Sequence, residues 1–315
     1  METRKLYYED PFQKGFATTV VSCDAVKGGY AVVLAETAFY PEGGGQPYDT
    51  GVLGEANVLE VHEKNGVITH LCDKPLEVGK SVSGKIDWAR RFDHMQQHSG
   101  EHICSGLICE RFHCDNVGFH MGADVVTIDF NADISWDELM EIEQLANLYI
   151  YEDHPIDIQF YRGAELDKVE YRSKKPLEGD VRIVSFPGAD CCACCGTHVV
   201  RSGQVGLVKF LSVQKFRDGV RIELLSGKRA HRYLSECWAQ DVRIAQALSV
   251  KPNASFAGVE RVLAELSALK QRCAKLEESV FAQTAAQYEG KGDVLLFEDE
   301  MSGDSLRKLC DAVTN

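Results

Sequence analysis

Two short motifs far apart in the sequence constrain the fold more than any other feature. The first, His98-Ser99-Gly100-Glu101-His102, carries imidazoles at positions i and i+4, which lie on one face of a helix. The second, Cys194-Cys195-Gly196-Thr197-His198, carries a thiol and an imidazole at the same spacing. Together they offer one sulfur and three nitrogen ligands, a set that suits a tetrahedral Zn²⁺ ion. We therefore expect a fold that brings residues 98–102 and 194–198 together around a metal.

Other metal sites remain open at this stage. Cys191, Cys192, Cys194 and Cys195 contain overlapping Cys-x-x-Cys pairs, which fit half of a structural zinc ribbon. The sequence holds no second Cys-x-x-Cys pair to complete it. His94 lies one turn before His98 and is either a further ligand on that face or a histidine of the core.

Glu101 stands between the two histidines of the first motif. A carboxylate there can act as general base on a water molecule, or it can orient a ligand histidine. The spacing His98-x-x-Glu101-His102 also fits the inverted zinc-peptidase pattern. In that pattern Cys194 and His198 have no role, so the second motif counts against it.

A glycine-rich segment, Gly43-Gly44-Gly45-Gln46-Pro47, is the third notable feature. Consecutive glycines are costly to order, so they are kept where a backbone approaches a partner closely or takes a positive φ. A flexible hairpin tip is the alternative interpretation. No Lys-Ser/Thr pair follows, so the segment does not indicate a nucleoside triphosphate site.

Composition favours an ordinary globular protein of about two domains, with 44% hydrophobic and 26% charged residues in 315. The N-terminus has no signal-peptide pattern and no apolar run is long enough for a membrane span, so we expect a cytoplasmic protein. Its twelve cysteines are then thiols or metal ligands rather than disulfides. A net charge of −14 disfavours broad binding to nucleic acid. Residues 201–235 are locally basic and form either a solvated face or a phosphate-binding surface.

Hydrophobic patterning predicts an α+β fold in four segments. Residues 1–90 show short β-prone runs at 30–34, 41–47, 58–61 and 67–71, with an Asn-Gly turn at 65–66, and indicate a small β-barrel-like domain. Residues 91–235 mix helices at 92–110 and 135–150 with strands at 125–130, 181–186, 205–213 and 220–225. Ser135 and Glu138 form a capping box signature at the second helix.

The last two segments are helical and then mixed. In 236–290, apolar residues between Val259 and Val280 alternate at spacings of three and four, which indicates a coiled arm or an amphipathic helix packed on its own domain. A homodimer through 259–280 is the corresponding partner hypothesis. In 291–315, an expected strand at 294–297 and a helix at 302–313 make an incomplete α/β unit, too small to stand alone.

The three motifs, taken together and in this order, resemble the family of alanyl-tRNA editing proteins, which are freestanding forms of the editing domain of alanyl-tRNA synthetase. The residues that carry the resemblance are Gly43 to Pro47, His98-x-x-x-His102 and Cys194-x-Gly196-Thr197-His198-Val199. It covers residues 1 to about 235, and the remaining chain resembles the extension of the longer members. Cys195 departs from the family pattern, which usually has glycine there, and Glu101 stands where many members have threonine.

The resemblance implies a role for each motif. His98, His102, Cys194 and His198 would hold Zn²⁺, and residues 91–235 would form the editing domain. Glu101 and Thr197 would be catalytic. The tRNA would contact the loop and the basic residues, namely Gly43, Gly44, Gly45, Gln46, Arg90, Arg91, Lys215, Arg217 and Arg221.

The implied reaction is hydrolysis of the ester that joins a wrong amino acid to alanine tRNA. Serine is the expected wrong amino acid and glycine the second candidate, because a pocket of alanine size cannot strongly reject an isostere with an added hydroxyl. Zn²⁺, Glu101 or Thr197 would recognise that hydroxyl. The non-catalytic alternative is a zinc-stabilised tRNA-binding module.

Overall fold

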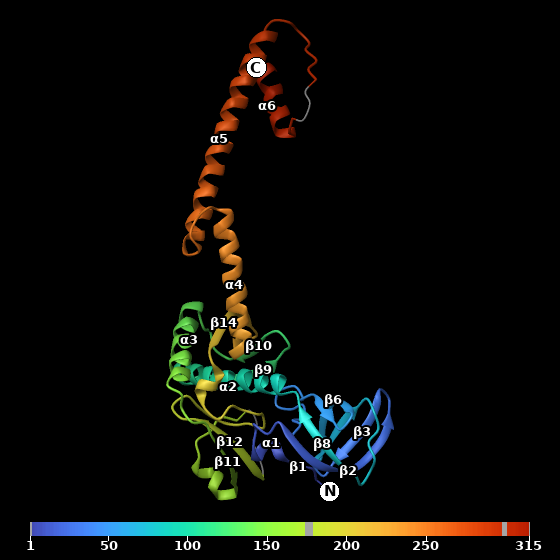
Figure 1. Ribbon diagram of the computed structural model, residues 1–315. Helices are drawn as coiled ribbons and strands as arrows, with labels where there is room; N and C mark the ends of the chain where they lie inside the picture. Colours follow the sequence, from blue (N-terminus) through green and yellow to red (C-terminus); the bar gives the residue numbers. More distant parts are fainter. Residues whose placement is uncertain (1, 174–178, 298–300, 315) are drawn as a thin grey trace. The chain divides into compact units, whose positions relative to one another are not determined.

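The computed structural model describes residues 2–173, 179–297 and 301–314 and has a mixed α+β fold. The chain divides into two compact units, Met1–Leu234 and Ser235–Asn315. Figure 1 shows the first unit as strands and helices and the second as helices. In the described residues, no helix has the length and apolar character that crossing a membrane requires.

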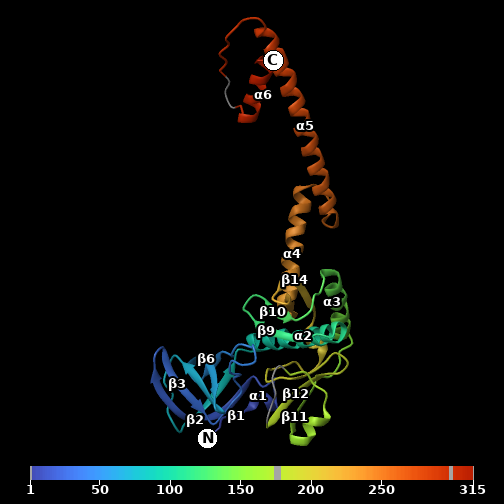
Figure 2. The ribbon, with the colours of Figure 1, turned by 180° about the vertical axis from the view of Figure 1, so that it is seen from behind.

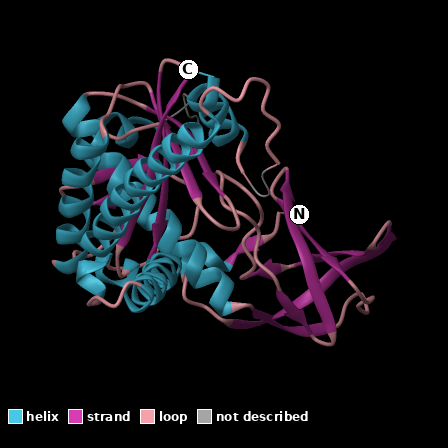
Figure 3. Ribbon diagram, turned by 90° about the horizontal axis from the view of Figure 1, so that it is seen from above, coloured by secondary structure: helices cyan, strands magenta, loops and turns pink. Residues whose placement is uncertain are grey.

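The first unit begins with strands that pair in a closed cycle. Their order is β2 (Gly15–Val26), β3 (Gly29–Leu34), β7 (Val67–Cys72), β6 (Ala56–Lys64), β5 (Gly51–Leu53) and β8 (Ser81–Ile86), which pairs back with β2. Figure 3 shows these strands, in magenta, gathered on the side of the N-terminus. Alternate residues of β7, such as Ile68 and Cys72, point into the core of this closed sheet. Three short elements, β1 (Arg4–Lys5), α1 (Leu6–Glu9) and β4 (Glu36–Thr37), complete the region.

The expected strand at 41–47 is wrong. This segment is a tight turn, in which Gly43 and Gln46 exchange backbone hydrogen bonds of 3.1 and 3.0 Å. Gly44 and Gly45 have φ values of 58° and 83°, and a strand cannot continue through such residues. The Asn65-Gly66 turn, by contrast, has the positive φ values that its hairpin requires.

A long buried helix, α2 (Trp88–Phe112), is the centre of the rest of the first unit. Asp87 caps its start by accepting a hydrogen bond from the backbone of Arg90. One sheet has the order β14 (Val208–Phe216), β15 (Gly219–Ser226), β10 (Val126–Phe130) and β9 (Asn116–Met121). A second sheet has the order β11 (Asp157–Arg162), β12 (Asp180–Phe186) and β13 (Asp190–Ala193).

The approach of α2 to the second sheet is close. A Cβ added to Gly106 would lie 2.0 Å from the carbonyl oxygen of Ala189, just before β13. Helix α3 (Trp136–Tyr151) has the capping box predicted from Ser135 and Glu138. The expected strand at 205–213 starts later than predicted, because residues Ser202–Val205 form a 3-10 helix, η2, before β14. A further 3-10 helix, η1 (Gly163–Lys168), follows β11.

Helix α4 (Gly227–Ala247) leads out of the first unit into η3 (Pro252–Ala254), α5 (Ser255–Tyr288) and α6 (Gly303–Thr314). Figure 2 shows α6 folded back alongside α5, and Ser305 of α6 donates a hydrogen bond to Glu277 of α5. The expected strand at 294–297 is wrong: these residues have no regular structure. Leu295 and Phe297 are 80% and 89% exposed, and a strand here has no partner among the described residues.

Candidate metal centre

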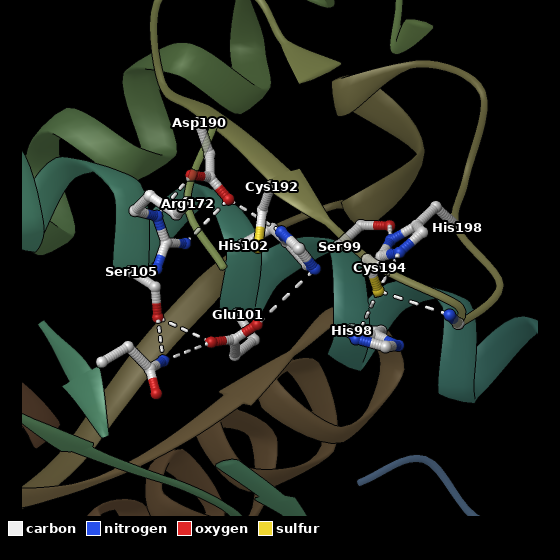
Figure 4. Close-up of polar contacts among 12 residues, drawn as sticks. His98, Ser99, Glu101, His102, Ser105, Arg172, Asp190, Cys192, Cys194 and His198 are labelled. Atoms are coloured by element: carbon white, nitrogen blue, oxygen red, sulfur yellow. Dashed lines mark hydrogen bonds and ion pairs between the residues drawn. The ribbon is translucent and has the colours of Figure 1, made fainter. Parts of the chain in front are cut away.

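The two motifs meet in the first unit. His98 and His102 project from one face of α2, while Cys194 and His198 follow β13. One nitrogen or sulfur atom from each of these four residues lies within 4.8 Å of the others. The sulfur of Cys194 is 3.5 Å from Nε2 of His98 and 3.3 Å from Nε2 of His198. Figure 4 shows the sulfur between these two rings.

Gly196 makes this meeting possible. A Cβ at this position would lie 2.1 Å from Cε1 of His98, so only glycine lets the loop pass over the ring. Arg182 of β12 fixes the same loop by donating to the carbonyl oxygens of Cys194 and Gly196, at 2.7 and 2.9 Å. The loop therefore positions the thiol and the imidazole by backbone contacts rather than by a helix.

The donor set fits a tetrahedral metal ion. Zn–N and Zn–S bonds of about 2.0 to 2.3 Å place neighbouring ligand atoms about 3.3 to 3.7 Å apart, close to the separations around Cys194. Each histidine also has its second ring nitrogen held by another residue, as metal-binding histidines do. The outer partners are Gln46 Oε1 for His98 (2.8 Å), Asp190 Oδ2 for His102 (2.7 Å) and Ser99 Oγ for His198 (3.2 Å).

Electrostatics shift the proton affinities of the ligands in different directions. Burial lowers the pKa of His102, but the Cys194 sulfur and the Asp190 carboxylate outweigh burial and raise that pKa well above its usual range. Burial alone raises the pKa of the Cys194 thiol, but the three neighbouring imidazoles bring that pKa well below its usual range. Burial lowers the pKa of His198 well below its usual range, despite the nearby sulfur. Thiolate and neutral imidazole are the forms that bind metals. Burial raises the pKa of Asp190, but hydrogen bonds from His102 and Arg172 outweigh this effect and bring that pKa below its usual value.

Glu101 lies beside the ligands and is buried, with 4% of its surface exposed. Its Oε1 accepts hydrogen bonds from Ser105 Oγ at 2.6 Å and from Asn116 Nδ2 at 2.8 Å. Its Oε2 is 4.0 Å from Nε2 of His102. One carboxylate oxygen is thus fixed by the protein and the other faces His102 of the four-residue cluster (Figure 4).

A pocket of about 620 Å³ opens over the cluster. Gly44, His98, Glu101, His102, Asn116 and Cys194 are among the residues that line it, and Arg172 and Arg182 form part of its wall. Asn116 Nδ2 donates hydrogen bonds to Glu101 and Ser105. Its buried Oδ1 has no hydrogen-bonding partner in the described part of the chain. The side chains of Glu101 and Asn116 therefore line the pocket close to the cluster.

Gln46 of the glycine-rich segment contacts Thr197 next to the cluster. Gln46 is fully buried; its Oε1 accepts from the Thr197 backbone at 3.1 Å and its Nε2 donates to Thr197 Oγ1 at 2.9 Å. Thr197 is 1% exposed, so its hydroxyl is used inside the protein. Both residues therefore support His98, whereas Gly44 lies at the pocket and Gly43 and Gly45 form the turn beside it.

The predicted basic residues do not form one surface. Arg91 is fully buried and pairs with Asp49, so it is not available to a phosphate, contrary to expectation. Lys215, Arg217 and Arg221 lie on the β14–β15 hairpin, where Arg221 pairs with Asp129. Arg90 lines a different hollow, together with Asp93 of α2 and Lys228 of α4.

The alternative metal sites receive less support from the geometry. Among the described residues, the four-residue cluster includes neither Cys191 nor Cys195, and it does not include His94. Cys192 belongs to a smaller group with His102 and Asp190, which shares a ligand with the main cluster. The inverted-peptidase pattern gives no role to Cys194 and His198, whereas both complete the cluster here.

Several residues of the site were not predicted from the sequence. Asp190, Ser99, Ser105, Asn116, Arg172 and Arg182 supply its outer hydrogen bonds and its pocket wall. Asp190 and Ser99 adjoin or fall within the two motifs, which was the available signal. Asn116 had no such signal, because its place beside Glu101 depends on the packing of β9 against α2.

Two family models match the chain. Residues 12–90 match the model of class II (A) tRNA synthetases, and residues 181–223 match the second additional domain of threonyl and alanyl tRNA synthetases. The chain is 30% identical to alanyl-tRNA editing protein Aarsd1-A of Xenopus laevis, over 90% of this chain and 73% of that protein. It is 31% identical to alanyl-tRNA editing protein AlaX-L of Pyrococcus horikoshii, over 93% of this chain and 74% of that protein.

A ligase is similar as well. The chain is 35% identical to the alanine–tRNA ligase of Pyrococcus abyssi, over 98% of this chain but only 35% of that enzyme. The chain thus spans about a third of the length of that ligase. Fold, site and family models define an α+β protein with a His₃Cys cluster that could hold a metal ion and with two regions, one of which includes Cys194 and His198, that match tRNA synthetase models. The chain belongs to the family of alanyl-tRNA editing proteins.

Proposed function

We propose that this protein is a trans-editing hydrolase that removes a wrong amino acid from alanine tRNA. The wrong amino acid is serine, with glycine as the second candidate. The observation that carries the proposal is the pocket over the His98, His102, Cys194 and His198 cluster, where the side chains of Glu101 and Asn116 line the wall beside a set of residues that could hold a metal ion. The family of the chain supports the choice of an aminoacyl ester on tRNA as substrate.

The cofactor in this proposal is Zn²⁺, because one thiolate and three imidazoles are the ligands this ion takes in tetrahedral sites. When bound, Zn²⁺ supplies a Lewis acid that polarises a carbonyl oxygen or acidifies a water molecule. His98, His102 and His198 direct Nε2 to the cluster because their Nδ1 atoms are held by Gln46, Asp190 and Ser99.

Glu101 is the general base in this account. Its Oε1 is held by Ser105 and Asn116, so its Oε2 is the atom that takes the proton of the attacking water. Hydrolysis forms a bond from water oxygen to the ester carbonyl carbon and breaks the bond from that carbon to the ribose oxygen. The proton then passes to the ribose oxygen as the leaving group. Thr197 acts through Gln46, as a positioning residue for His98.

Asn116 is our candidate for recognising serine. Its Oδ1 is buried and unpartnered among the described residues, and the serine hydroxyl is a donor that would pair with it. Alanine has no such donor and leaves the amide oxygen unpaired, which costs binding energy in a buried site. The pocket would therefore spare correctly charged tRNA.

The test is deacylation of alanine tRNA that carries either serine or alanine. Metal-loaded protein is expected to hydrolyse the serine ester much faster than the alanine ester. Glu101→Gln should lower the serine rate by about 100-fold or more, in the range for loss of a general base. Equal rates on both esters, or an unchanged Glu101→Gln variant, would contradict the proposal.

A further inference from the structure

A fully buried ion pair joins the region of the closed sheet to α2. Arg91 lies near the start of α2, and Asp49 lies between the glycine-rich segment and β5; neither side chain is exposed. Arg91 Nε contacts the two carboxylate oxygens of Asp49 at 3.2 and 3.0 Å, and Nη2 contacts one of them as well. Arg91 also donates to the carbonyl oxygens of Pro11 and Ala38, at 3.1 and 2.6 Å. The reaction proposed above uses neither member of this pair.

Hydrogen bonds lead from Asp49 to the glycine-rich turn. Asp49 Oδ2 accepts from the backbone nitrogen of Tyr40 at 2.7 Å, and the backbone nitrogen of Asp49 donates to the Tyr40 carbonyl oxygen at 3.0 Å. The buried Tyr40 donates from its hydroxyl to the carbonyl oxygen of Gly43 at 3.1 Å. Gly43 is also bonded to Gln46 across the turn. The ion pair therefore fixes the place of the turn beside α2.

The turn determines which nitrogen of His98 carries hydrogen. Gln46 Oε1 lies 3.1 Å from the backbone nitrogen of Thr197 and 2.8 Å from Nδ1 of His98. A backbone N–H group can only donate, so the Gln46 atom that faces it is the amide oxygen. That oxygen can only accept, so Nδ1 of His98 carries the hydrogen. In the neutral ring, Nε2 is then the bare nitrogen, and this is the atom that lies beside the Cys194 sulfur.

The same turn holds the face of the His98 ring. Phe119 of β9 stacks on that ring, with the ring centroids 5.0 Å apart and an angle of 25° between the planes. Gly45 lies directly against Phe119, because a Cβ at Gly45 would come within 2.6 Å of the phenyl ring. The carbonyl oxygen of Gly45 also accepts from the backbone of Met121 in β9 at 3.1 Å. A displaced turn would release both the edge and the face of the imidazole.

We propose that Asp49 and Arg91 are positioning residues of the metal centre, which hold the glycine-rich turn so that His98 keeps one tautomer and one ring angle. The inference rests on the proposed function for the ion, Zn²⁺, that the cluster binds. Arg91 and His98 lie about two turns apart on α2, so the series of contacts leaves this helix at the ion pair and returns to it at the ligand. The helix thus carries both the ligand and the anchor of the segment that orients it.

The Zn²⁺ affinity of the full chain, measured by competition with a chelator, tests the inference. Asp49→Asn keeps the shape of the side chain and removes its charge. It should weaken Zn²⁺ binding by about 10-fold or more, in the range for loss of the partner of a ligand histidine. In the metal-free protein, ring-nitrogen NMR should show hydrogen on Nδ1 of His98 alone, and a mixture of both tautomers in Asp49→Asn.

A double-variant cycle separates positioning from a general loss of structure. If Asp49 acts through the turn, adding Asp49→Asn to Gln46→Ala should cost far less Zn²⁺ affinity than adding it to the unchanged protein. Independent effects would instead multiply within about twofold, and that result would overturn the proposal. If Asp49→Asn does not fold, Tyr40→Phe replaces it in the cycle, because it removes only the hydroxyl bond to Gly43. An unchanged Zn²⁺ affinity in Tyr40→Phe would then overturn the proposal.

Asp93→Asn is the matched control. Asp93 also lies on α2 and pairs with an arginine, Arg229 of α4, but it has no contact with the glycine-rich turn among the described residues. This variant should keep the Zn²⁺ affinity and the His98 tautomer of the unchanged protein even where its thermal unfolding temperature falls. An equal loss of Zn²⁺ affinity in Asp93→Asn and Asp49→Asn would contradict the role of the buried pair.

Failure of this inference and failure of the proposed function give different results. If the unchanged protein hydrolyses the serine ester but Asp49→Asn keeps its Zn²⁺ affinity and His98 tautomer, only the positioning role fails. If Asp49→Asn loses Zn²⁺ affinity through Gln46 but the unchanged, metal-loaded protein hydrolyses neither ester, the positioning role stands and the editing proposal fails.

Discussion

The orientation of three imidazoles is the feature of the site most sensitive to single residues. Each ring shows Nε2 to the cluster because Nδ1 is bound elsewhere, to Gln46, Asp190 or Ser99. A partner of this kind fixes the tautomer and the ring angle, and its loss typically lowers metal affinity 10- to 100-fold. The ligands alone therefore do not define the site.

Asp190→Asn should weaken metal binding by about 10- to 100-fold, because His102 Nδ1 and Arg172 both lose a carboxylate partner. A competition titration against a chelator measures the affinity. Asp129→Asn is the matched control, since Asp129 also holds an arginine through two bonds, to Arg221, away from the cluster. Equal metal affinities in the two variants would contradict the role assigned to Asp190.

Asn116→Ala should reduce the preference for serine over alanine by about 10-fold or more, because the amide oxygen that pairs with the hydroxyl is removed. Ser105→Ala is the control: it removes a hydrogen bond to Glu101 Oε1 but keeps that amide oxygen. The ratio of deacylation rates on the two esters is the measurement. If both variants lose rate equally while the ratio stays unchanged, Asn116 does not select serine.

At the scale of elements, local signals predicted most helices and strands. The capping box of Ser135 and Glu138 fixes the start of α3, and Asn65-Gly66 fixes the hairpin of β6 and β7, because both signals act through neighbouring residues. Predictions failed where an element needs a distant partner or a special backbone. Residues 294–297 have no strand to pair with among the described residues, and positive φ values at Gly44 and Gly45 end any strand at 41–47.

Strand β7 places a titratable group in the core of the closed sheet. His70 is fully buried between Thr37 and the carbonyl oxygen of Val32, and burial lowers its pKa to about 4. The unfolded chain takes up this proton near pH 6.5, so stability is fully present above that pH and falls as the pH drops towards about 4. The loss from this one group is roughly 3 kcal/mol at its largest.

Urea unfolding at several pH values tests this expectation. In His70→Gln, which does not titrate, the free energy of unfolding should decline less between pH 6.5 and 4 than in the unchanged protein. Parallel declines in the two proteins would mean that another group causes the acid sensitivity. The comparison uses the slopes, because the substitution also changes the stability at neutral pH.

At the scale of the whole molecule, the site depends on the meeting of two distant stretches. The spacing of His98 and His102, and that of Cys194 and His198, predicted which side chains could bind a metal. It could not predict Asn116, because the place of this residue at the pocket arises where β9 packs against α2. The prediction that Arg91 contacts tRNA was also wrong, because its guanidinium is buried against Asp49.

Self-association through 259–280 stays a proposal. Val262, Leu266 and Leu269 of α5 are 41%, 46% and 56% exposed, which leaves an apolar stripe of heptad spacing for a second copy. Sedimentation should show a dimer that Leu266→Glu/Leu269→Glu abolishes. Ser267→Glu/Gln271→Glu adds the same charge to neighbouring exposed positions and should leave it intact; a monomeric unchanged protein would exclude the dimer.

The central claim is that the four-residue cluster holds the metal on which deacylation depends. The most direct test strips the protein with a chelator, adds Zn²⁺ stepwise, and measures occupancy and hydrolysis of seryl alanine tRNA in the same samples. We predict that the rate rises in proportion to occupancy and saturates at one equivalent, and that His102→Ala stays inactive. Full hydrolysis by the metal-free protein would contradict the account.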